Sequence, residues 1–172
     1  MTSRRAFAAV VLSWLALAGG SDAAQQATSA AKIAELQARF DRETNSGRKA
    51  KLLEKLGDAQ FVESRRAGKA GDYQTVGLLL EKYRDNVRAA LAAVRRQHPR
   101  AEKDSGGYKR IEVHVRRGLR ELDETLLVAP PPYRPPLHIV RNDLQEIEEE
   151  LLRLLFPRRP GEQPVPRKPP AP

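Results

Sequence analysis

The sequence predicts an all-α protein with about five helices, arranged as an up-and-down bundle or as packed helical hairpins. Apolar residues recur about every 3.6 residues along five successive segments, and most of the 13 prolines lie between these segments or after the last one. Good helix formers such as Ala, Leu, Arg, Lys and Glu are abundant. The chain contains no cysteine, so the stability of this fold has to come from side-chain packing and not from disulfides.

The first two predicted helices differ in how much of their circumference is apolar. The first, about residues 27–45, has one narrow apolar side. The second, about residues 47–69, has apolar residues around much of its circumference, which indicates contacts with helices on two sides. Gly68 to Asp72 then interrupts the pattern, and Asp72 is a suitable N-cap for the helix that follows.

Three further segments with apolar residues at helical spacing follow, at about residues 73–98, 107–128 and 136–156. Residues 111–115 alternate between apolar and polar as a strand does, but the helical period continues on both sides of them and favours a helix. A proline-rich connector precedes the last segment. Short connections between amphipathic helices favour antiparallel neighbours.

Residues 1–24 are predicted to be an export signal. Arg4 and Arg5 form a positive start, residues 6–18 form a short apolar run, and residues 21–24 offer small side chains for cleavage. The mature protein is therefore expected to be exported, periplasmic or secreted.

The export signal leaves its route open, because the segment Ser-Arg-Arg-Ala-Phe near its start also fits the twin-arginine signature. An uncleaved membrane anchor is a third interpretation, but the apolar run is shorter than the roughly 20 residues that a spanning helix needs. We therefore expect no stable transmembrane segment after cleavage.

The predicted domain organisation places one helical domain at residues 25–157 and a disordered tail at residues 158–172. The tail contains prolines and basic residues and almost nothing apolar, so it cannot bury enough surface to fold alone. Pro166 and Pro169 also have the PxxP spacing of a polyproline ligand, which is the alternative interpretation of this tail.

The charges of the fourth predicted helix oppose the helix dipole, because basic residues lie at its start and acidic residues at its end. An antiparallel fifth helix would explain this distribution. The expected pairs join Arg116, Arg117 and Arg120 to Glu146, Glu148, Glu149 and Glu150, and Arg141 to Asp123 and Glu124.

A basic cluster is predicted where the second and third helices form a hairpin. It contains Arg48, Lys49, Lys51, Arg95, Arg96, Arg100 and Lys103. These cations would converge beside the free backbone N–H groups at the start of the second helix, a combination that attracts anions. The alternative is a solvated surface on which the long side chains spread apart.

No motif in the sequence predicts a reaction, a cofactor or a metal site. His98, His114 and His138 lie on three different predicted segments and lack metal-ligand spacing, so a structural or surface role is expected for each. The glutamates at 146 and 148–150 could hold a cation, but a solvated helix face is the simpler interpretation.

Two resemblances bear on the fold. The second and third predicted helices resemble one tetratricopeptide-type hairpin, in the segments Leu56-Gly57-Asp58-Ala59, Ala70-Gly71-Asp72-Tyr73 and Leu80-Glu81-Lys82-Tyr83. That family forms protein-binding scaffolds from stacked repeats, although no second copy is visible here. The chain, including residues 114–124, is also similar to uncharacterised exported helical proteins of bacteria, which implies an envelope location and a helical fold.

The predicted function is that of a non-enzymatic exported protein. It would bind another envelope macromolecule, either a protein or an anionic surface, through a helical face or the basic cluster. A structural or stress-related periplasmic protein without a specific ligand is the first alternative. Nucleic-acid binding is the second, suggested by the net charge of +9, but the export signal and an aromatic content of 5% argue against it.

Overall fold

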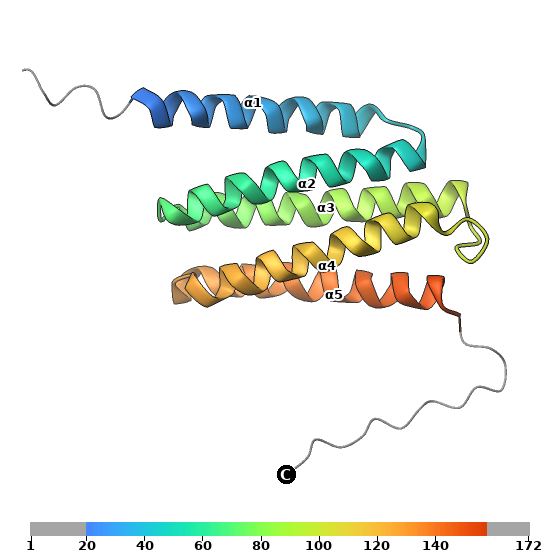
Figure 1. Ribbon diagram of the computed structural model, residues 1–172. Coiled ribbons are helices and arrows are strands. Elements are labelled where there is room, and N and C mark those ends of the chain that lie inside the picture. The colour runs from blue at the N-terminus through green and yellow to red at the C-terminus, as the bar shows by residue number, and fades with distance from the viewer. Residues whose placement is uncertain (1–19, 158–172) are drawn as a thin grey trace, which may run out of the picture.

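The structure is a computed structural model that describes residues 20–157, and it confirms the all-α fold (Figure 1). The elements are α1 (Gly20–Arg42), α2 (Ser46–Lys69), α3 (Tyr73–Gln97), α4 (Ser105–Val128), the short 3-10 helix η1 (Pro131–Tyr133) and α5 (Arg134–Leu155). No strand occurs within residues 20–157, so residues 111–115 are helical as predicted.

The first helix departs most from its predicted boundaries. It begins at Gly20, in an alanine-rich stretch of high helix propensity, and not near residue 27. It ends at Arg42 because Asn45 serves as the N-cap of α2, its side chain accepting a hydrogen bond from the Arg48 backbone N–H at 3.0 Å. The predicted export signal lies outside the described residues except for residues 20–24, and the predicted tail lies outside them entirely.

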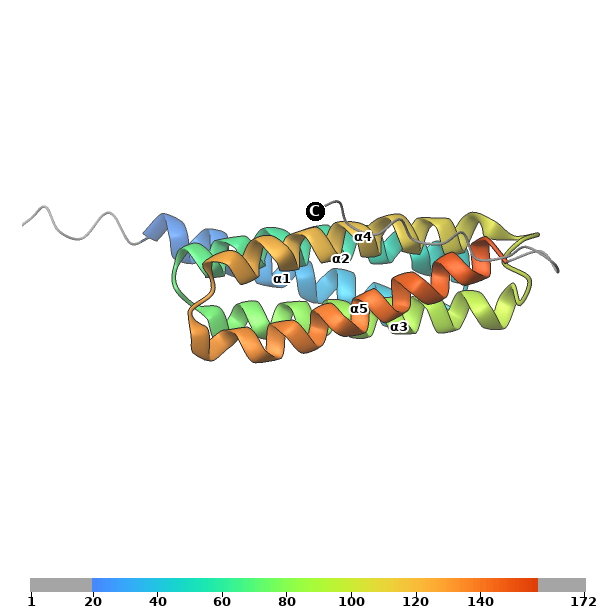
Figure 2. The same ribbon diagram turned by 90° about the horizontal axis from the view of Figure 1, so that it is seen from below.

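Successive helices run up and down in three layers (Figure 1). The α2–α3 and α4–α5 hairpins pack against each other, and α1 lies on the outer side of the α2–α3 pair (Figures 1 and 2). Helix α2 contacts α1, α3 and α4, which explains its wide apolar circumference and confirms the predicted contacts on two sides.

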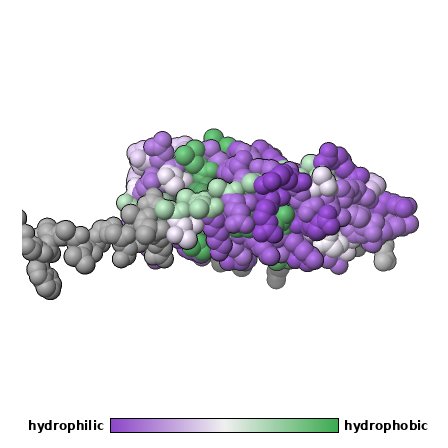
Figure 3. All heavy atoms as spheres, turned by 90° about the horizontal axis from the view of Figure 1, so that it is seen from above, coloured by the Kyte–Doolittle hydropathy of each residue, from purple (hydrophilic) through white to green (hydrophobic). Residues whose placement is uncertain are grey.

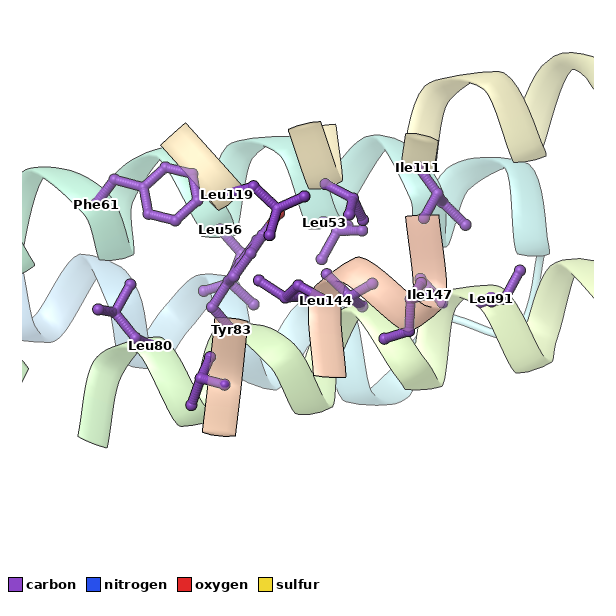
Figure 4. Close-up of a cluster of buried hydrophobic side chains, with 14 of the residues drawn as sticks. Leu53, Leu56, Phe61, Leu80, Tyr83, Leu91, Ile111, Leu119, Leu144 and Ile147 are labelled. Atoms are coloured by element: carbon purple, nitrogen blue, oxygen red, sulfur yellow. The ribbon is translucent and has the colours of Figure 1, made fainter. Parts of the chain in front are cut away.

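The core lies inside the four helices α2 to α5 (Figure 4). Leu53 and Leu56 of α2 and Leu144 of α5 belong to one cluster of buried side chains that includes residues of α3 and α4, and all three leucines are fully buried. Burying a side chain of this size stabilises the fold by about 1.5–3 kcal/mol. Helix α1 adds a smaller contact through Leu36 and Phe40.

The α2–α3 turn has the predicted chemistry. Gly71 has a φ of 78°, and the Asp72 N–H donates to the Ala67 carbonyl at 2.9 Å, the hydrogen-bond pattern of a Schellman C-cap. Asp72 then caps α3 by accepting from the Thr75 backbone N–H at 3.1 Å. Hydrogen bonds from Thr75 lower the pKa of the Asp72 carboxyl.

Ion pairs fix the register of α2 against α4, which run parallel. Arg110 pairs with Glu54 at 2.9 Å, and Arg65 pairs with Glu121; each pair joins residues 56 positions apart in the chain. Because each pair spans the same sequence distance, the two helices keep one alignment along their contact.

The predicted charge pairing between α4 and α5 was right for one pair and wrong for the others. Arg141 does pair with Asp123 at 2.6 Å. However, Arg116 pairs with Glu112 in its own helix, and Arg117 pairs with Asp58 of α2 at 2.7 Å. Among the described residues Arg120 forms no ion pair. The reason is that this basic side of α4 faces α2 as well as solvent.

The remaining acidic residues of α5 lie mostly away from those arginines. Glu150 pairs with Arg95 of α3. Glu148 interacts weakly with Arg116, because its charge adds to the larger effect of Glu112 in raising the pKa of Arg116. Helix α5 therefore divides its charges between α3 and α4.

Tyr83 of α3 is fully buried and lies against glycines of both α2 and α4. A Cβ atom added to Gly118 of α4 would lie 2.5 Å from the Tyr83 ring, and one added to Gly57 of α2 would meet the Tyr83 and His114 rings. The two glycines therefore make room for the tyrosine, whose ring packs edge-on against Phe61 with ring centroids 4.7 Å apart.

We predict opposite effects of alanine at two helix-interior glycines. Gly118→Ala should destabilise the fold by about 1–3 kcal/mol, because the Tyr83 ring fills the space that the new methyl group needs. Gly77→Ala, with no neighbouring atom within 4 Å, should stabilise it by up to about 1 kcal/mol through higher helix propensity. Urea unfolding followed by circular dichroism measures both; equal effects would contradict the proposed close packing.

Candidate functional site

The predicted basic cluster lies at one end of the bundle. The α1–α2 turn, the end of α3 and the α3–α4 loop meet there (Figure 1). Gln97 joins them, because its amide donates to the Thr44 carbonyl at 2.7 Å and its oxygen accepts from the Ser46 N–H at 3.0 Å. We call this end, with the seven cations named above, the basic end.

Three of the seven cations are engaged by other groups of the protein. Arg48 pairs with Glu43 at 2.9 Å. The Lys49 ammonium donates to the Phe40 carbonyl at 2.8 Å and lies 4.4 Å from the centroid of the Phe40 ring. Arg95 pairs with Glu150 of α5. The charges of these three side chains are therefore already engaged within the protein.

Four cations of the basic end are exposed and form no ion pair with any described residue. They are Lys51, Arg96, Arg100 and Lys103. The α3–α4 loop also carries two exposed carboxylates, Glu102 and Asp104, of which Asp104 lies 3.8 Å from His98 Nδ1. The positive charges outnumber these carboxylates, and none of the four is held by packing.

The predicted contribution of free N–H groups at the start of α2 was wrong. The Ser46 N–H donates to Gln97 and the Arg48 N–H donates to Asn45. The helix start is thus capped by the protein's own side chains. Any attraction for anions at this end must come from the exposed ammonium and guanidinium groups.

Sequence reasoning missed a buried polar network between α2, α3 and α4. The Tyr83 hydroxyl lies 2.9 Å from His114 Nδ1 and also 2.9 Å from the His114 carbonyl oxygen. On the other side of the imidazole, Nε2 lies 3.4 Å from Asp58 Oδ1, and that carboxylate pairs with Arg117. His114 is 5% exposed, and its ring stacks on Phe61.

Burial controls the protonation of this network. Loss of solvation lowers the pKa of His114, and the nearby Asp58 carboxylate opposes that effect. Burial also raises the pKa of the Tyr83 hydroxyl. The Tyr83 hydroxyl has one proton, which it donates either to the His114 carbonyl or to Nδ1, according to the tautomer of the imidazole. Both rings are enclosed by helices, and their hydrogen bonds join α3 to α4.

The open grooves of the described surface include two that border α2. One lies between α1 and α2, has a volume of about 550 Å³ and is lined by Thr28, Ser29, Lys32, Leu36, Lys55, Asp58, Ala59 and Val62. The other, of about 370 Å³, lies between the end of α2, the start of α3 and the end of α4.

The other side chains considered as possible ligands do not form a metal-binding cluster among the described residues. Within residues 20–157 no three His, Asp or Glu side chains gather closely enough to hold a metal ion, and Glu146, Glu148, Glu149 and Glu150 lie along α5. His138 is exposed at the start of α5. None of the five helices is long and apolar enough, within this described part, to cross a bilayer.

No protein-family model, curated protein or solved structure matches this chain. The tetratricopeptide-like hairpin and the likeness to exported helical proteins of bacteria therefore stay predictions from the sequence.

We predict that stability falls as the pH drops below about 6.5, the pKa of an unfolded histidine. In that range the unfolded chain binds a proton at residue 114 before the folded chain does, so up to about 1.4 kcal/mol is lost per pH unit until the lowered folded pKa is reached. The charged groups facing this imidazole are Asp58 and Glu54 of α2 and Arg117 of α4.

The measurement is urea unfolding at pH 7.5 and 5.5 for the wild type and His114→Gln. The variant should be less stable at both pH values but should lose less stability between them, since glutamine does not titrate. Equal losses in the two proteins would show that other groups cause the pH dependence.

Proposed function

We propose that the protein is a non-enzymatic, exported helical protein that binds an acidic macromolecule of the cell envelope through its basic end. The partner is an anionic surface or an acidic protein. Export rests on the predicted signal in residues 1–24, and the absence of catalysis rests on the lack of a catalytic motif in the sequence.

The observation that carries this proposal is the contrast among the cations of the basic end. Arg48, Lys49 and Arg95 are used in internal contacts, whereas Arg96, Arg100 and Lys103 extend into solvent from the end of α3 and the loop that follows. These exposed side chains stay hydrated, and their positive charges raise the local concentration of anionic partners.

The test is binding to phosphatidylglycerol vesicles and to heparin at increasing salt. A basic residue near an anionic membrane contributes about 1 kcal/mol. The variant Arg96→Glu/Arg100→Glu/Lys103→Glu should therefore bind vesicles more than about tenfold more weakly than the wild type. Binding of the wild type should decrease steeply with salt because the charges are exposed.

The matched control is Lys69→Glu/Lys82→Glu/Arg120→Glu, which makes the same change in net charge elsewhere. All three control residues are exposed and form no ion pair with described residues, and Lys69 lies in the last turn of its helix as Arg96 does. An equal loss of binding in both variants would mean that net charge alone attracts the anion, and the basic end would have no special role.

A second candidate is contact with another protein through the opposite end of the bundle. Large apolar side chains are exposed around the α4–α5 connector and the neighbouring part of α3, namely Leu78, Leu127, Val128, Tyr133 and Ile139. On the face that carries α1, hydrophobic residues also lie among the hydrophilic ones, mainly in the left half of the view (Figure 3). A crosslinked envelope partner that is retained by the basic-end variant but lost in Leu127→Ser/Ile139→Ser would favour this candidate.

A further inference from the structure

The groove between α1 and α2 combines an apolar floor with two cations that form no ion pair within the described part of the chain. Leu36, Ala59 and Val62 form the apolar part, and Val62 is 57% exposed although it lies on a packed helix. The groove volume of about 550 Å³ falls within the range of about 300–1,000 Å³ that is typical of small-molecule sites. An apolar surface placed over this valine would gain favourable burial.

Two lysines flank this apolar floor, one from each helix. Lys32 of α1 and Lys55 of α2 both line the groove, both are exposed, and neither forms an ion pair with a described residue. By contrast, Arg84, Arg95 and Arg117 each pair with a carboxylate of a neighbouring helix. The groove therefore offers two positive charges to a bound molecule without first breaking an internal contact.

The single carboxylate in the groove lining does not cancel these charges. Asp58 is held by Arg117 of α4 at 2.7 Å, and His114 Nε2 approaches the same oxygen at 3.4 Å. The Asp58 charge is thus compensated from the α4 side. The local field in the groove is set mainly by Lys32 and Lys55.

We propose that the α1–α2 groove binds a single-chain anionic amphiphile, such as a free fatty-acid carboxylate. The alkyl chain lies on Leu36, Ala59 and Val62, and the anionic head group lies between Lys32 and Lys55. A single chain fits because the groove runs between one pair of helices. This site is separate from the basic end and does not depend on the function proposed above.

The test is isothermal titration calorimetry of the purified protein with dodecanoate below its micelle concentration. Saturable binding is expected, and dodecyltrimethylammonium, with the same chain and the opposite charge, should bind at least about tenfold more weakly. The variant Lys32→Glu/Lys55→Glu should weaken dodecanoate binding to a similar degree. Both lysines are exposed, so the variant should keep its helical circular dichroism spectrum.

Two further variants test the location. Ala59→Phe should block the apolar floor without a change in charge and should weaken the binding of dodecanoate. The variant Lys82→Glu/Lys103→Glu makes the same change in net charge outside the groove. Its affinity for dodecanoate should stay within about twofold of that of the wild type. The basic-end variant should also retain dodecanoate binding, whatever its affinity for vesicles.

Several results would overturn the proposal. They are the absence of saturable binding to free dodecanoate, equal binding of the cationic amphiphile, and unchanged binding in Lys32→Glu/Lys55→Glu. Binding to phosphatidylglycerol vesicles without binding to free dodecanoate would likewise overturn it. Loss of vesicle binding in the basic-end variant, with dodecanoate binding intact, would support two independent sites.

Discussion

The close packing of Tyr83 between α2 and α4 is the constraint on which the bundle depends. Two glycines leave space for one aromatic ring, and the hydroxyl of that ring is satisfied by His114, a residue of α4. A buried hydroxyl without a partner would cost about 1–3 kcal/mol, so the axial position of α4 is tied to that of α3. The ion pairs of α2 with α4 on either side of this point then hold the same alignment.

Charge is distributed along this framework according to whether a side chain meets a neighbouring helix. The guanidinium groups of Arg84, Arg95 and Arg117 reach carboxylates across helix boundaries. At the basic end Arg96, Arg100 and Lys103 are exposed and form no ion pair with a described residue. Unpaired positive charge among the described residues is therefore found at places that include the basic end and the α1–α2 groove.

The helices, the Gly71 turn, the Asp72 cap and the Arg141–Asp123 pair could be predicted because each depends on residues close in sequence or on a short connection. The partners of Arg95 and Arg117 could not, because apolar periodicity gives the buried side of a helix but not its rotation toward each neighbour. A signal for the buried network was present in the sequence, since Gly57 and Gly118 interrupt good helix formers and indicate close contacts between helices.

Helix α1 has a special position, because the other four helices enclose their own core without it. It is held by Leu36 and Phe40, by the Ser29 hydroxyl donating to Glu63 at 2.7 Å, and by paired amides of Gln37 and Asn86 at 3.0 Å. Local opening of α1 should therefore cost less free energy than unfolding the bundle. The α1–α2 groove exists only while α1 is docked, so any ligand that contacts both walls must stabilise the docked state by mass action. Ligand binding and the docking of the first helix are thus expected to be coupled, with protection of α1 amides from hydrogen exchange as their common measure.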